Sequence, residues 1–207
     1  MSKKIFTTAI IPVMVIAFFA SCGVRKNSRT TDEGVVINGI RWATRNVDAP
    51  GTFTANPEDF GMLFQWNRRQ GWSATNREVK GWNSFIPAGT AWYAENDPCP
   101  PGWRVPTREE LQKLADAVSI WTAINGVNGR LFIDTAANQI FLPAAGGRNV
   151  DGTRSIESVG YWGFYSSATQ HSEIHDWRLQ FSSSRSAWVH NVSSRVGGFS
   201  VRCVAKK

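Results

Sequence analysis

Apolar residues fall in short runs along the chain, and residues typical of turns separate these runs. The runs Val35-Val36-Ile37 and 40–43 flank Asn38-Gly39. Asn-Gly between β-forming residues predicts a tight hairpin. Residues 61–66 (GMLFQW) predict a further short strand, whereas residues 67–96 are rich in loop-forming residues. The first half of the chain is therefore expected to be short strands joined by long loops.

One segment has the apolar periodicity of a helix. Thr107 and Glu110 have the spacing of a capping box, in which each side chain bonds to the other's backbone N–H. We therefore expect a helix from Arg108 to about Ser119. The apolar positions with helical spacing are Leu111, Leu114, Ala115 and Val118. Residues 121–131 contain two Asn-Gly pairs and are expected to form turns.

The last third of the chain reads as β structure. Ile140-Phe141-Leu142 predicts a buried strand that Pro143 ends, and residues 144–154 predict a glycine-rich loop. The spacing of the later apolar runs fits an antiparallel meander. Its predicted strands are Gly160–Ser166, Asp176–Ser182, Ser186–Val192 and Gly198–Val204. The sequence therefore predicts an α+β fold: a twisted antiparallel sheet, one or two helices and long loops.

The bulk composition indicates one ordered domain. The chain has 207 residues, of which 42% are hydrophobic and 19% charged. These proportions are typical of globular proteins and exclude a disordered chain. The formal net charge is +7, but Lys and Arg are spread along the sequence and form no run of five or more. Without a basic stripe, nucleic acid is not expected as a partner.

The N-terminus resembles a bacterial lipoprotein signal. Lys3 and Lys4 precede an apolar run over residues 5–20, and Ser21-Cys22-Gly23 follows. This order predicts a signal peptide over residues 1–21 with lipid attachment at Cys22. An ordinary signal peptide with an incidental cysteine is the alternative. Residues 22–33 then predict a lipidated cysteine and a flexible tether, and residues 34–207 the domain. The expected location is the bacterial outer membrane, at the cell surface or on the periplasmic face.

Two cysteines remain in the exported domain, Cys99 and Cys203. In an oxidising compartment two cysteines favour a disulfide, which here would close a loop of about 100 residues. Two free buried thiols are the alternative.

Several segments together resemble the family called the Fibrobacter succinogenes major paralogous domain. The matching pieces are WATRN (42–46), GMLFQW (61–66), CPPGWRVPTREEL (99–111), LPAAG (142–146), GYW (160–162), YSS (165–167) and SVRCV (200–204). The resemblance implies an exported, often lipid-anchored bacterial surface module with a C-type lectin-like fold. That fold implies a disulfide from the first helix region to the last strand, as Cys99 and Cys203 would form. The sequence departs from the family at Gly163-Phe164, where we expect a β-bulge.

Aromatic and loop residues are the candidate ligand-binding groups. Alternation along the strand places Trp177 with Leu179 and Phe181, so Trp177 is expected to be buried, whereas Trp188 faces the other way. Indole rings stack on sugar faces and dominate many interfaces. Trp42, Trp66 and Trp103 are expected in the core. The ligand-binding candidates are Arg148, Asn149, Asp151, Trp162 and Trp188.

One segment contains residues that could ligate a metal. His171, Glu173 and His175 lie in a predicted polar loop, and His190 could add a ligand from a neighbouring strand. They are weak candidates, because the spacing matches no established zinc pattern. The tripeptides of calcium-dependent lectins are missing too. The sequence therefore predicts neither a metal nor another cofactor.

No motif in the sequence predicts catalysis, because there is no nucleophile elbow and both domain cysteines read as structural. The leading expectation is a non-catalytic, lipid-anchored envelope module for adhesion that binds glycan or protein. A structural subunit of a surface assembly is one alternative. A polysaccharide-acting enzyme is the other, because paired carboxylates are not recognisable from spacing alone.

Overall fold

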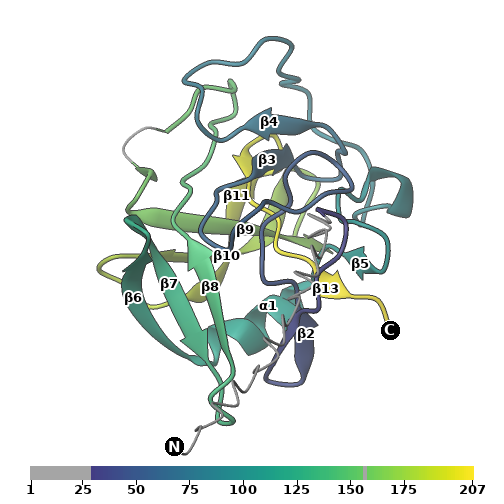
Figure 1. Cartoon of the computed structure of the whole chain (residues 1–207). Helices are drawn as coiled ribbons and strands as arrows, with labels where there is room; N and C mark the ends of the chain where they lie inside the picture. Colours follow the sequence, from purple (N-terminus) through teal and green to yellow (C-terminus); the bar gives the residue numbers. More distant parts are fainter. Residues whose placement is uncertain (1–28, 156–157) are drawn as a thin grey trace, which may run out of the picture.

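The computed structural model describes residues 29–155 and 158–207 as four small β-sheets, largely antiparallel, around one short α-helix (Figure 1). The first sheet has β1 (Val35–Ile37), β2 (Ile40–Trp42), β13 (Val204–Ala205) and β5 (Trp103–Arg104) in that order. The second has β12 (Gly198–Phe199), β3 (Met62–Gln65) and β4 (Gly71–Ser73). The third has β6 (Val118–Ile124), β7 (Val127–Ile133) and β8 (Gln139–Pro143). The fourth has β11 (Trp188–Ser194), β10 (His175–Ser182) and β9 (Trp162–Gln170). The β-rich class is thus confirmed.

The predicted early strands are present. β1 and β2 form a hairpin whose turn residues, Asn38 and Gly39, have φ values of 48° and 79°. Positive φ at both central turn positions matches the right-handed twist of the two strands, which is why Asn-Gly suits this site. β3 follows the predicted strand, and the long loop after β4 contains a single 3₁₀ turn, η1 (Ala94–Asn96).

The helix α1 (Arg108–Ala115) begins as predicted and ends early. Thr107 accepts a hydrogen bond from the N–H of Glu110, and Glu110 accepts one from the N–H of Thr107. The predicted extension to Ser119 is wrong, because Val118 opens β6 and pairs with Ile133 of β7. Pairing with a neighbouring strand overrides the helical spacing here.

Of the turns predicted for residues 121–131, the one at Asn125-Gly126 is present, but it joins β6 and β7 in a long hairpin, and the second predicted turn is wrong. Asn125 and Gly126 form the hairpin turn, with φ values of 49° and 81°. Gly129, in the second Asn-Gly pair, lies inside β7, where a Cβ atom would lie 2.5 Å from Cζ of Phe141. Close packing against that ring, and not a turn, accounts for this glycine.

The predicted meander is present in β9, β10 and β11, but its predicted last strand does not join it. Residues 198–204 instead contribute β12 to the sheet of β3 and β13 to the sheet of β2. The expected bulge at Gly163-Phe164 is wrong as well, since both residues pair regularly with β10. The register shifts instead between Asp176 and Arg178.

The core has two parts. The first surrounds α1 and comprises Ile37, Trp42, Leu111, Leu114, Phe132, Ile140, Leu142, Ala144, Tyr165, Leu179, Phe181 and Val204. The second comprises Ala43, Val47, Phe53, Phe64, Trp66, Trp92, Cys99, Trp103, Val105, Val201 and Cys203. Trp42, Trp66 and Trp103 are buried, as predicted.

Cys99 and Cys203 form a disulfide across a sequence separation of 104, with their Cα atoms 6.1 Å apart. The predicted pair is therefore correct and the free-thiol alternative is wrong. The bond connects the segment before α1 to the end of the chain. A structural disulfide indicates an oxidising, extracytoplasmic compartment.

The segment expected to be a flexible tether is packed at its end. Asp32 accepts hydrogen bonds from the backbone N–H groups of Gly34 and Thr44, and its side chain is 1% exposed. This carboxylate is part of the fold, since burying an unpaired charge would be costly. The predicted signal peptide and Cys22 lie outside the described residues. Within the described part of the chain, no helix has the length and apolar character needed to cross a membrane.

Candidate functional site

The sheet of β9, β10 and β11 has two chemically different faces, as strand alternation requires. Tyr165, Leu179 and Phe181 point into the core beside α1. The other face carries aromatic and polar side chains in register: Gln180 pairs with Phe164 on one side and Trp188 on the other. Arg178 lies opposite His190 and Ser166. A sheet packed against the core on both faces would not present such a mixture of aromatic and polar side chains.

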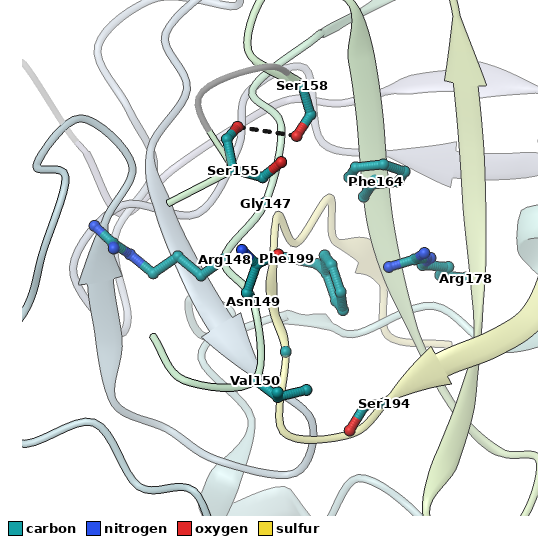
Figure 2. A pocket seen from close by; sticks show the side chains of 11 residues that line it. Gly147, Arg148, Asn149, Val150, Ser155, Ser158, Phe164, Arg178, Ser194 and Phe199 are labelled. Atoms are coloured by element: carbon teal, nitrogen blue, oxygen red, sulfur yellow. Dashed lines mark hydrogen bonds between the residues drawn. The ribbon is translucent and has the colours of Figure 1, made fainter. Parts of the chain in front are cut away.

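Two adjoining cavities open on this outer face. One, of about 320 Å³, is lined by Trp162, Phe164, Arg178, Gln180, Arg185, Trp188 and His190. The other, of about 490 Å³, lies between the outer face and the glycine-rich loop (Figure 2). Its side-chain lining includes Asn149, Val150, Ser155, Ser158, Ser194 and Phe199. Phe164 and Arg178 line both cavities, and we call the two together the aromatic groove. Volumes of this size are typical of ligand sites.

The rings of the aromatic groove form a continuous surface. Trp162 and Phe164 are stacked, with centroids 5.8 Å apart and planes 13° apart. Trp188 meets Trp162 edge to face at 6.0 Å. Phe199, from a different sheet, meets Phe164 edge to face at 5.8 Å. The result is a row of four rings across two sheets.

Arg178 lies at the junction of the two cavities. Its Cζ atom is 4.5 Å from the ring centroid of Phe164 and 4.3 Å from that of Phe199. Such cation–π contacts fix a guanidinium in place. Burial lowers the pKa of Arg178 to about 10, and nearby Asp176 acts in the opposite direction. Arg178 therefore remains charged at neutral pH.

Asp176 is a buried acid at the same end of β10. Neither of its carboxylate oxygens has a hydrogen-bond partner among the described residues. Burial raises the pKa of Asp176 to about 7, against the lowering effect of Arg178 and Arg195. An acid with such a raised pKa can be a functional group or a structural compromise.

Arg148 was predicted to bind ligand through its side chain, and the structure contradicts this. Its guanidinium is buried and donates to the carbonyl oxygens of Ser73, Asn76, Arg77 and Gly152. In Figure 2 the side chain points away from the groove. Arg148 therefore holds the loop in shape, because its donors are already occupied.

The remaining binding candidates divide. Trp162, Trp188 and Asn149 line the aromatic groove, as a ligand site would need. Asp151 does not line it: its carboxylate accepts from the N–H and Oγ1 of Thr153, which closes an exposed turn. Arg178, Phe164 and Phe199 were missed. Alternation along β10 could have placed Arg178 on the outer face of the sheet. No sequence signal indicates that Phe199, which belongs to another sheet, lies beside β9.

Trp177 is half-buried, not buried as predicted. The register shift after Asp176 moves it out of the alternation that Leu179 and Phe181 follow. Its ring lies 4.9 Å from the His171 ring and 4.3 Å from Cζ of Arg108. It packs at the surface between these two side chains.

The weak metal candidates are not brought together. His171 faces Asn191 at 3.3 Å, whereas Nδ1 of His175 is 3.3 Å from Oγ of Ser172. Glu173 is exposed, and His190 lines the aromatic groove. Within residues 29–155 and 158–207, no group of three or more His, Cys, Asp or Glu residues could hold a metal ion.

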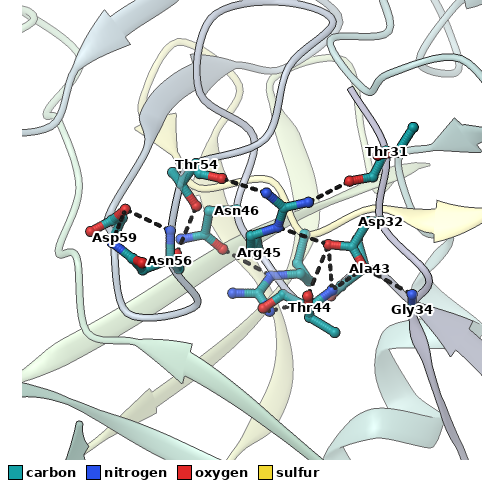
Figure 3. Close-up of polar contacts among 11 residues, drawn as sticks. Thr31, Asp32, Gly34, Ala43, Thr44, Arg45, Asn46, Thr54, Asn56 and Asp59 are labelled. Atoms are coloured by element: carbon teal, nitrogen blue, oxygen red, sulfur yellow. Dashed lines mark hydrogen bonds and ion pairs between the residues drawn. The ribbon is translucent and has the colours of Figure 1, made fainter. Parts of the chain in front are cut away.

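A second polar cluster surrounds Asp32 beside another cavity, of about 540 Å³ (Figure 3). Nε of Arg45 lies 3.1 Å from the Asp32 carboxylate, and Oγ1 of Thr44 donates to it at 2.9 Å. Arg202 donates to Asn46 and to the carbonyl of Thr44. These groups mostly satisfy one another, so the cluster reads as the structural closure of the N-terminal segment.

The fold and the groove define a disulfide-linked, β-rich domain with an open aromatic site. Comparisons with protein-family models, with curated proteins and with solved structures each found no match to this chain. The case for a function therefore rests on the groove itself.

Proposed function

We propose that the protein is a non-catalytic binding module that holds a glycan in the aromatic groove. The observation that carries the proposal is the row formed by Trp162, Phe164 and Trp188 on the outer face of the β9–β11 sheet. Sugar rings have faces of C–H groups that stack on aromatic side chains, while polar neighbours set orientation. Asn149, Ser155 and Ser158 supply polar groups at the neighbouring cavity.

The setting of this module is part of the same proposal. The basic and apolar N-terminus with Cys22 supports export and a lipid anchor in a bacterial envelope. The Cys99–Cys203 disulfide is compatible with that compartment. The resemblance of residues 35–204 to the Fibrobacter succinogenes major paralogous domain supports a C-type lectin-like relationship and a role in adhesion.

A second candidate function is docking to a protein of a surface assembly. Phe85 and Ile86 favour it, because their side chains are 83% and 52% exposed on a long loop. Adjacent exposed apolar side chains are typical of interaction sites. This loop does not line the aromatic groove, so the two functions can be separated by mutation.

A glycan-binding screen with the purified protein tests the leading proposal. We expect saturable binding to at least one neutral or acidic oligosaccharide, and a loss of about tenfold in affinity in Trp188→Ala, as for one lost aromatic contact. Phe85→Ala is the matched control, because it removes an exposed ring away from the groove. If no glycan binds, or if both variants bind like wild type, the groove is not a sugar site. A protein partner lost only in Phe85→Ala would support the second candidate.

A further inference from the structure

We propose that the aromatic groove selects glycans that carry a carboxylate, and that Arg178 is the residue that binds this group. The inference rests on the proposed glycan-binding function and names the chemical class of the ligand. Two independent features of the groove support it: the sign of the charges that line it, and the state of the Arg178 guanidinium.

The charges that line the groove are all of one sign. Arg178 and Arg185 contribute side-chain cations. None of the described residues that line either cavity is Asp or Glu. A cleft with one sign of charge and low-dielectric walls attracts the opposite charge. The aromatic groove is therefore suited to an anionic ligand.

The Arg178 guanidinium is positioned but lacks the partners that the other buried arginines have. Arg130, Arg148, Arg195 and Arg202 each donate to backbone carbonyl oxygens. For Arg178, the described residues contribute no hydrogen bond to any guanidinium nitrogen and no carboxylate within 4.0 Å, whereas in Arg130 and Arg195 only Nε lacks a partner. A buried polar group left without a partner is a cost that a ligand can relieve.

The rings beside Arg178 explain how an unpartnered guanidinium keeps its position. Phe164 and Phe199 hold its Cζ atom at 4.5 Å and 4.3 Å from their centroids. A guanidinium presents its N–H donors in its own plane and pairs with a carboxylate in a fork-to-fork geometry. In Figure 2 the side chain extends from β10 toward Phe199 and the cavity. A carboxylate on a sugar stacked against Phe164 would meet these donors.

Asp176 does not substitute for such a ligand. It is the described carboxylate whose charge acts on Arg178, yet it makes no ion pair with it and has its pKa raised to about 7 by burial. Arg195 is the other charged group that acts on Asp176. Arg178 thus keeps a net attraction for an incoming anion.

The test compares acidic oligosaccharides with neutral partners of the same backbone. Three pairs serve: an oligogalacturonate and its methyl ester, an alginate oligomer and its methyl ester, and sialyllactose and lactose. We expect the protein to bind at least one acidic member roughly tenfold more tightly than its neutral partner, as for one charge-assisted hydrogen-bonded pair. Added salt should reduce this difference.

Variants separate the inference from a general charge effect. Arg178→Gln should abolish the preference for the acidic partner, and Arg178→Lys should restore only part of it, because lysine lacks the planar fork. Lys80→Gln removes one exposed charge outside the groove and should keep the full preference. The thermal melts of all three variants establish that they fold. The preference of the wild-type protein for acidic oligosaccharides is measured without any variant, so it tests the inference even if a variant fails to fold.

The outcomes distinguish the two proposals. Equal binding of the acidic and neutral partners, lost in Trp188→Ala, would overturn the carboxylate inference and leave the glycan proposal standing. Binding of no oligosaccharide would overturn both. A preference that Arg178→Gln leaves unchanged would overturn the role of Arg178.

Discussion

Nη1 of Arg148 donates to the carbonyl oxygen of Gly152 over 2.7 Å, and Nη2 reaches the carbonyl of Asn76 at 2.6 Å. One guanidinium thus ties the glycine-rich loop to itself and to the loop that follows β4. The glycine-rich loop lines one cavity of the aromatic groove, so the shape of this wall depends on a guanidinium whose donors are occupied by carbonyl oxygens.

Replacement of Arg148 by methionine should destabilise the protein. The substitution removes the hydrogen bonds from the guanidinium to four carbonyl oxygens, and hydrogen bonds to charged groups each contribute about 1.5–3 kcal/mol. We expect the free energy of unfolding to fall by roughly 3 kcal/mol, measured by urea denaturation. Arg185→Met, at an exposed arginine, is the control and should change little. An unchanged midpoint in Arg148→Met would contradict the structural role.

The disulfide should contribute strongly to stability. It closes a loop with a sequence separation of 104 between the segment before α1 and the last strand. Loss of a native disulfide typically costs about 2–5 kcal/mol, because the unfolded chain gains freedom. We expect the double variant Cys99→Ser, Cys203→Ser to lower the midpoint of urea denaturation. Reductant should lower the wild-type midpoint and leave that of the double variant unchanged; equal midpoints for both proteins would argue against the bond.

Local signals were sufficient to predict several parts of the fold. The Asn38-Gly39 turn and the capping box of Thr107 and Glu110 depend on residues no more than three positions apart, so the local sequence is enough to predict them. Cys99 and Cys203 were predictable for a different reason: only two cysteines were left to pair. The strand at 61–66 followed from a short apolar run, and the meander after residue 160 from the spacing of the apolar runs.

The predictions failed where distant contacts decide the structure. Val118 has helical spacing, yet pairing with Ile133 makes it a strand residue. Gly129 looks like a turn glycine, yet it accommodates the ring of Phe141. The site shows the same limit. The positions of Trp162 and Trp188 in predicted strands were enough to select them as binding candidates. Phe199 lies beside Phe164 only because two sheets meet there, and the guanidinium of Arg148 donates to carbonyl oxygens of loops distant in the sequence.

Gly163 should tolerate no larger side chain, because the ring of Phe181 packs against its Cα atom. A Cβ atom on Gly163 would lie 2.1 Å from Cζ of Phe181. Overpacking in a core typically costs about 1–3 kcal/mol, so Gly163→Ala should lower the free energy of unfolding by that amount. Phe181→Leu removes the clashing ring, and the double variant should be more stable than the sum of the two single effects predicts. Strict additivity would show that the two residues do not compete for space.

The buried carboxyl of Asp176 should make the protein less stable as the pH rises from about 4 to about 7. In the unfolded chain an aspartate has a pKa of about 3.9, whereas burial raises the pKa of Asp176 to about 7 in the folded protein. Between these values the folded state binds the extra proton, so the free energy of unfolding decreases with increasing pH. The stabilising contribution is therefore fully present below pH 4 and is lost through pH 7.

Asp176→Asn isolates this contribution from that of the other ionisable groups. Asparagine has nearly the same shape and no charge, so the melting temperature of the variant should exceed that of wild type by a few degrees more at pH 8 than at pH 5, the size expected for one or two kcal/mol in a chain of this length. Asp151→Asn is the control, because hydrogen bonds from Thr153 lower the pKa of Asp151 and keep it ionised at both pH values. If wild type and Asp176→Asn show the same difference in melting temperature between pH 5 and pH 8, Asp176 is ionised throughout that range and its partners in solution differ from those in the structure.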